Sequence, residues 1–138
     1  NSDASEQLRL ALPIIQANRD SLLDLAKLAL RASDHANCIA AFDKAIAIKD
    51  SADARVMRGM CRRSMKDNAG AKDDFQTATK LDPRFPQAWF NLGELLASTS
   101  QIADAIKAYE TCVKIDATTE VGKRAAAKLQ EIKKSTKR

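Results

Sequence analysis

Residues 86–119 read PQAWFNLGELLASTSQIADAIKAYETCVKIDATT, and this stretch decides the fold. Its apolar residues follow helical spacing in two runs, which are separated by the polar stretch Ser98-Thr99-Ser100-Gln101. Apolar residues three and four positions apart form one face of a helix, and a short polar stretch between two such runs is typical of a turn. The pattern therefore predicts two antiparallel helices joined as a hairpin.

The same pattern occurs twice more in the preceding chain, at spacings of 33 and 34 residues. Five columns of residues repeat together: Phe42, Phe75 and Tyr109; Ala26, Gly59 and Gly93; Cys38, Ala71 and Ala105; Ala45, Ala78 and Cys112; and Ile48, Leu81 and Ile115. Small residues allow two helices to approach closely, and a larger side chain fills the space beside them. A period of this length indicates a stack of helical hairpins.

These columns resemble the tetratricopeptide repeat, most fully in the third unit, which has Trp89, Leu92, Gly93, Leu96, Ala105 and Tyr109. The resemblance implies an all-α fold, a right-handed superhelix of antiparallel helical hairpins with seven or eight helices. We place the repeats at 19–51, 52–85 and 86–119. Residues 1–18 are expected to form an amino-terminal helical capping segment, in which Pro13 breaks or starts a helix. Its apolar residues, expected to cover the first hairpin, are Leu8, Leu12, Ile14 and Ile15.

The net charge of +5 is concentrated at the carboxyl end of the chain. Residues 120–138 contain seven Lys or Arg and two Asp or Glu, so residues 1–119 are balanced. The apolar residues Val121, Ala125, Leu129 and Ile132 fall on one helical stripe, which predicts a basic, amphipathic helix that solvates the end of the stack.

The resemblance also implies a concave groove, lined by the first helix of each hairpin, that binds a peptide or an amphipathic helix of another protein. The predicted groove residues are Leu23, Lys27, Val56, Met57, Met60, Arg63, Phe90, Asn91 and Glu94, and the same helix faces also carry Leu30, Asp53 and Gln87. Flexible Met side chains beside an aromatic ring are typical of such a surface. We therefore expect a scaffold or adaptor that binds a partner protein.

Members of the family that bind chaperone tails hold a terminal carboxylate with Lys, Asn and Arg side chains. The matching positions here, Leu23, Lys27, Met57, Gln87 and Asn91, all depart from that pattern. Acidic carboxyl-terminal tails of chaperones are therefore not the expected partners.

Three arginines on one helical face, Arg55, Arg58 and Arg62, have two interpretations. Their alkyl stems could pack between hairpins while the guanidinium groups reach acids such as Asp20 or Asp24. Alternatively, they could form an anion site, which together with the basic carboxyl-terminal helix would bind RNA or an anionic surface. A second alternative for the whole domain is homo-oligomerisation.

Few residues suggest chemistry. The single histidine, His35, is expected in the turn of the first hairpin. Trp89 is expected to pack in the core between helices. The adjacent acids Asp73 and Asp74 are expected on a solvated helix face. Cys38, Cys61 and Cys112 form no CxxC pair, so neither a disulfide framework nor a zinc site is predicted, and Cys38 and Cys112 are expected to be small buried residues. The sequence thus predicts no enzyme, no catalytic residue, no cofactor and no metal, and it favours a cytoplasmic, reducing location. No apolar run is long enough for a membrane span.

Overall fold

The computed structural model describes residues 2–136, with the backbone alone for residues 2–9, 11, 12, 14 and 15. In this part of the chain there are seven α-helices and no strands. They are α1 (Ser2–Arg31), α2 (His35–Ile48), α3 (Ala52–Ser64), α4 (Asn68–Leu81), α5 (Pro86–Ser98), α6 (Ile102–Ile115) and α7 (Glu120–Thr136). The predicted all-α class is confirmed.

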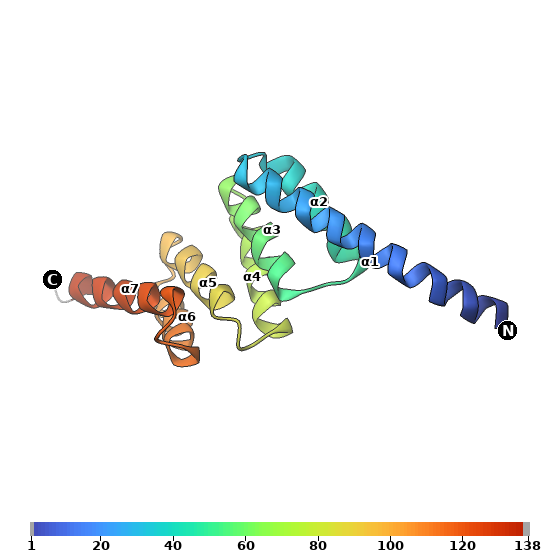
Figure 1. The fold of residues 1–138 in the computed structure, drawn as a ribbon. Helices are drawn as coiled ribbons and strands as arrows, with labels where there is room; N and C mark the ends of the chain where they lie inside the picture. Colours follow the sequence, from blue (N-terminus) through green and yellow to red (C-terminus); the bar gives the residue numbers. More distant parts are fainter. Residues whose placement is uncertain (1, 137–138) are drawn as a thin grey trace.

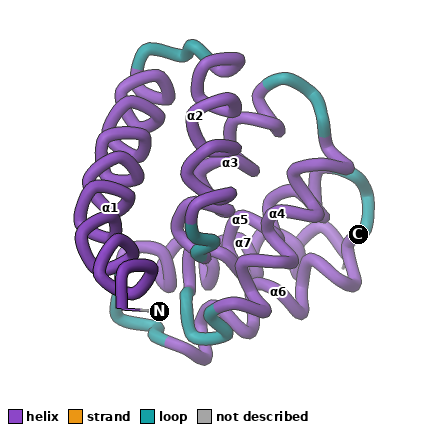
Figure 2. Tube along the Cα trace, turned by 90° about the vertical axis from the view of Figure 1, so that its right-hand side faces the viewer, coloured by secondary structure: helices purple, strands orange, loops and turns teal. Residues whose placement is uncertain are grey.

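Consecutive helices pack against one another along the whole chain. The hairpins α1/α2, α3/α4 and α5/α6 stack in sequence order, and α7 closes the stack at the end opposite α1 (Figure 1). Figure 2 shows the helices as tubes, with short loops that join each helix to the next one in the chain. This arrangement is the superhelix of hairpins that the repeat period predicts.

Each turn between the two helices of a hairpin has a residue in the left-handed region, at Ser33 (φ 59°), Lys66 (φ 69°) and Ser100 (φ 65°). In the first two turns an aspartate follows and caps the next helix. Asp34 accepts a hydrogen bond from the backbone N–H of Asn37, and Asp67 accepts one from that of Gly70. These caps satisfy amide groups that would otherwise lack a partner at the helix start.

The column of small residues allows the two helices of a hairpin to touch. A Cβ atom added to Gly59 would lie 2.6 Å from the Phe75 ring, and one added to Gly93 would lie 2.9 Å from the Tyr109 ring. The aromatic side chain of each second helix thus occupies the space that the glycine of the first helix leaves open. This contact is the physical reason why the two columns repeat together.

The prediction for Pro13 is wrong, because α1 is one continuous helix of 30 residues with Pro13 inside it. Since α2 has only 14 residues, the amino-terminal part of α1 extends well beyond it (Figure 1). The side chains of Leu8, Leu12, Ile14 and Ile15 lie outside the described part, so their predicted capping role stays a prediction.

Candidate binding groove

The first helices of the hairpins, together with α7, surround an open groove with a volume of about 440 Å³. Four of the predicted residues line it: Val56, Met57, Met60 and Asn91. Leu30, Asp53 and Gln87, which the repeat register places on the same helix faces, line it as well. The structure therefore brings the centre of the predicted surface together.

Three lining residues were not predicted: Glu120, Val121 and Arg124 of α7. The sequence assigns α7 to the end of the stack, outside the hairpins. In the structure, α7 packs on α5 and α6. It takes the position that the first helix of a fourth hairpin would have. The amphipathic stripe of residues 120–138 was the available signal, because a helix that covers the last hairpin also borders its groove.

Phe90 does not offer an accessible surface in the groove. Its side chain is 5% exposed and belongs to the core cluster that extends from α3 to α7. The Tyr109 ring lies 5.9 Å away between centroids, and the Arg124 guanidinium lies 4.8 Å above the Phe90 ring. Arg124 thus forms a cation–π contact that covers the ring from the groove side.

Glu94 is held by a side chain of the neighbouring helix. The buried hydroxyl of Tyr109 donates a hydrogen bond of 2.6 Å to Glu94 Oε1. Burial of the phenol, together with this bond to Glu94, raises the pKa of Tyr109 far above its ordinary value. The hydrogen bond therefore links α5 to α6, and the Glu94 carboxylate already accepts a hydrogen bond within the domain.

Leu23, Lys27 and Arg63 are half-buried and are not among the residues that line the groove. Leu23 packs against the cluster of α1, α2 and α3. Val56 is nearly buried, at 3% exposed, whereas Met60 is 38% exposed. The accessible apolar surface is therefore smaller than the predicted one, and it is centred on Met57 and Met60.

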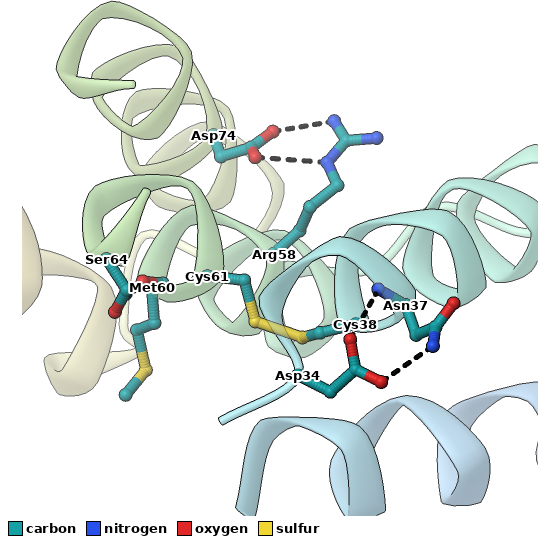
Figure 3. Close-up of a disulfide and its surroundings, with 8 residues drawn as sticks. All are labelled: Asp34, Asn37, Cys38, Arg58, Met60, Cys61, Ser64 and Asp74. Carbon is teal, nitrogen blue, oxygen red and sulfur yellow. Dashed lines mark hydrogen bonds and ion pairs between the residues drawn. A yellow bond between two sulfur atoms is a disulfide. The ribbon is translucent and has the colours of Figure 1, made fainter. Parts of the chain in front are cut away.

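The three arginines of α3 converge on one buried carboxylate, that of Asp74 on α4. Asp74 is fully buried and accepts hydrogen bonds from Arg55 (3.2 Å), Arg58 (2.7 and 3.0 Å) and Arg62 (3.0 Å). Figure 3 shows the two parallel bonds from Arg58 to Asp74. The prediction that Asp74 is solvated is therefore wrong, although its neighbour Asp73 is exposed.

Three further acids complete this cluster, and one of them, Asp67, lies 4.0 Å from Arg62 Nε. Arg55 binds Asp50 in the loop before α3 through two bonds of 2.9 Å, and Arg58 reaches Asp43 of α2 at 2.8 Å. The hydrogen bond from Arg55 holds the pKa of Asp50 below its ordinary value. The acids that neutralise the arginines are thus Asp43, Asp50, Asp67 and Asp74, and not the predicted Asp20 and Asp24.

A disulfide joins Cys38 of α2 to Cys61 of α3, with their Cα atoms 6.6 Å apart (Figure 3). The prediction that the cysteines form no disulfide is therefore wrong for this pair. The predicted cytoplasmic, reducing location depended on unpaired cysteines and loses that support. Cys112 is free and buried, and burial raises the pKa of its thiol to about 11.

Two other residues noted in the sequence have structural positions. Trp89 packs against the larger core cluster and donates a hydrogen bond from its indole N–H to the carbonyl of Pro83 (2.9 Å). His35 is the first residue of α2 instead of part of the turn. In the described part of the chain, no helix is long and apolar enough to cross a membrane.

A stack of antiparallel helical hairpins, each packed on the next, defines an α-helical repeat protein. Residues 56–118 match the tetratricopeptide repeat family. This part of the chain consists of tetratricopeptide repeats, and the repeat columns before residue 56 follow the same pattern.

A curated relative from Mycosarcoma maydis, the small glutamine-rich tetratricopeptide repeat-containing protein 2, is 31% identical over 104 residues. The match covers 75% of this chain and 30% of the relative, so this chain spans less than a third of that protein's length.

Solved structures show the same fold at low sequence identity. The Sgt2 TPR domain of Aspergillus fumigatus is 19% identical with a TM-score of 0.77, over 87% of this chain and 82% of that one. The translocator chaperone SycD of Yersinia enterocolitica is 18% identical with a TM-score of 0.82, over 86% of each chain. The second TPR domain of human RPAP3 was solved in complex with the HSP70 peptide SGPTIEEVD. It is 18% identical with a TM-score of 0.77, over 86% of this chain and 98% of that one. The family and fold support a protein–protein interaction module.

Proposed function

We propose that this chain is a non-enzymatic scaffold or adaptor, and that its groove binds an amphipathic helix or peptide of another protein. The observation that carries the proposal is the open groove bordered by α1, α3, α5 and α7, whose partly exposed apolar side chains are Met57 and Met60 at its centre with Leu30 and Val121 beside them. Met side chains are flexible and polarizable, so they adapt to an apolar side chain of a bound segment.

Charged residues border this apolar centre and give the groove a polarity. Asp53 and Glu120 lie in the first turns of α3 and α7, whereas Arg124 lies one turn further along α7. A bound segment that places apolar side chains on Met57 and Met60 therefore meets two carboxylates at one end. Charge complementarity of this kind selects partners and fixes the orientation of a bound helix.

Met60→Glu is the sharpest test, because Met60 is partly exposed and lines the groove. Peptides would be selected on the parent chain from a displayed library of amphipathic helices, and their affinity would then be measured by titration calorimetry. We expect Met60→Glu to weaken binding by about tenfold or more, since a carboxylate replaces an apolar contact. Met65→Glu is the matched control, because Met65 is exposed and does not line the groove. Selected peptides that bind both variants as tightly as the parent would refute the groove assignment.

The departures at Leu23, Lys27, Met57, Gln87 and Asn91 lead us to propose that the groove does not bind the acidic tails of chaperones. Met57 lines the groove, and the Asn91 side-chain amide donates a hydrogen bond to the Gln87 carbonyl within α5. The peptide SGPTIEEVD is a direct probe. We expect no saturable binding, and micromolar affinity would show that a different set of side chains holds the carboxylate.

Binding of RNA or an anionic surface is the weaker candidate. Arg55, Arg58 and Arg62 already bind Asp74, so the exposed lysines of α7, among them Lys123, Lys133 and Lys134, would have to provide the attraction. Such binding weakens steeply with salt. Removal of residues 133–138 would then reduce the salt dependence, whereas a groove ligand would be unaffected.

A further inference from the structure

The outer surface of the α1/α2 hairpin, which we call the end face, exposes large apolar side chains. Leu25 is 56% exposed, Leu28 is 62% exposed and Ile48 is 39% exposed. Two adjoining hollows of about 490 and 570 Å³ lie on this face and share Leu22, Leu25 and Lys44. Contiguous apolar surface of this kind on a water-exposed domain marks an interaction site.

The repeat register shows what the end face is built to contact. Leu22 and Leu25 occupy the columns that hold Arg55 and Arg58 in α3, and Trp89 and Leu92 in α5. In those later helices, the columns face the preceding hairpin: Arg58 reaches Asp43 of α2, and Leu92 is buried in the cluster that includes Phe75 of α4. The end face is therefore a surface of the type that joins one hairpin to another.

The two ends of the stack have different chemistry. At the far end, the outward residues of α7, such as Lys123, Lys133 and Lys134, are exposed and basic, and its apolar stripe is packed against the core. A head-to-tail contact between two copies would place these lysines on Leu25 and Leu28 and would bury unpaired charge. A contact between two identical end faces buries leucine on leucine instead.

We propose that the end face pairs with the same face of a second copy of this chain about a two-fold axis, with the two α1 helices antiparallel. The charged residues that line the two hollows are Lys44 and Asp34, which have opposite signs. In an antiparallel pair, Asp34 of one copy comes close to Lys44 of the other copy, and the two-fold axis repeats this contact. Each lysine therefore has an acid in the other copy. Such a patch is self-complementary, as an isologous interface requires.

The dimensions of the face suit a small dimer interface. The residues of the two helices whose side chains the structure describes without a gap, 16–31 of α1 and 35–48 of α2, span about 24 Å and 21 Å, and at ~10 Å width they give a footprint of roughly 450 Å² per copy. A standard specific interface buries about 800 Å² of accessible surface per partner, so we expect a dimer that forms at the higher protein concentrations.

Sedimentation equilibrium of the whole 138-residue chain, from about 1 to about 500 µM, tests the proposal. We expect the mass to rise from that of one 15.1 kDa chain to that of two. The double variant Leu25→Glu/Leu28→Glu should raise the dimer Kd by about 100-fold or more. Met65→Glu/Leu81→Glu is the matched control, because both residues are about as exposed and lie off the end face. Circular dichroism would verify that both variants are folded.

A mass of one chain at every concentration would overturn the proposal, and so would a dimer that survives the end-face variant. A dimer lost instead with Met60→Glu would place the contact in the groove and would also overturn it. Cross-linking adds an independent measurement. Under mild oxidation, Leu25→Cys should form an inter-chain disulfide and Leu81→Cys should not, whereas equal cross-linking of both would contradict a specific interface.

Discussion

Arg58 and Asp74 form a buried, bidentate ion pair that joins α3 to α4. Arg58 Nε donates to Asp74 Oδ2 at 3.0 Å and Nη2 donates to Oδ1 at 2.7 Å, and the carboxylate is fully buried. Arg55 and Arg62 bind the same carboxylate. The buried Asp74 carboxylate thus binds Arg55, Arg58 and Arg62 of α3, which from the sequence alone could be taken for a site that binds an external anion.

Asp74→Asn should destabilise the domain by about 3–5 kcal/mol, because it leaves three arginines without their shared buried counter-charge. The neighbouring Asp73→Asn is the control, and since Asp73 is exposed we expect a change within about 0.5 kcal/mol. Urea unfolding followed by far-ultraviolet circular dichroism measures both variants. A loss below about 1 kcal/mol for Asp74→Asn would contradict the organising role of this carboxylate.

Asp50 gives the arginine cluster a defined dependence on pH. The hydrogen bond from Arg55 holds the folded-state pKa of Asp50 below the ordinary 3.8, so its contribution is complete above that pH and is lost as the pH falls through the lowered pKa. The parent should therefore lose more stability between pH 7 and about pH 3 than Asp50→Asn does. The pair is partly exposed, so the difference should be less than about 1 kcal/mol. Parallel losses in the two proteins would show that the pair contributes nothing to acid sensitivity.

Thiol counting tests the link between the first two hairpins. The denatured, non-reduced chain should give one reactive thiol, that of Cys112, and the reduced chain should give three. In the folded state Cys112 should react slowly, because it is buried and its pKa is raised to about 11. Reduction should cost about 3 kcal/mol of stability by the chain-entropy relation for a loop of 23 residues. Three thiols without reductant would show that Cys38 and Cys61 are not bonded.

Residues whose role is packing could be predicted from the sequence, because the packing repeats with the period. Gly59 lies against Phe75 and Gly93 against Tyr109 in the way the columns indicate. Contacts that occur once in the stack could not be predicted in this way. The burial of Asp74 depends on three arginines from another helix, and Cys38 meets Cys61 only because α2 packs on α3. Likewise, Phe90 occupies a groove column but is covered by Arg124 of α7, which the period does not include.

Glutamate substitutions at Phe90 and Met60 separate the core from the accessible surface of the groove. Phe90 is 5% exposed and packs on Tyr109 beneath Arg124, so Phe90→Glu should destabilise by about 3–5 kcal/mol. Met60 is 38% exposed, so Met60→Glu should change stability by about 0.5 kcal/mol or less while it weakens groove binding. Urea midpoints at equal protein concentration give both values. If Phe90→Glu were as stable as the parent, α7 would not cover the ring, and Phe90 would return to the accessible surface that a partner can contact.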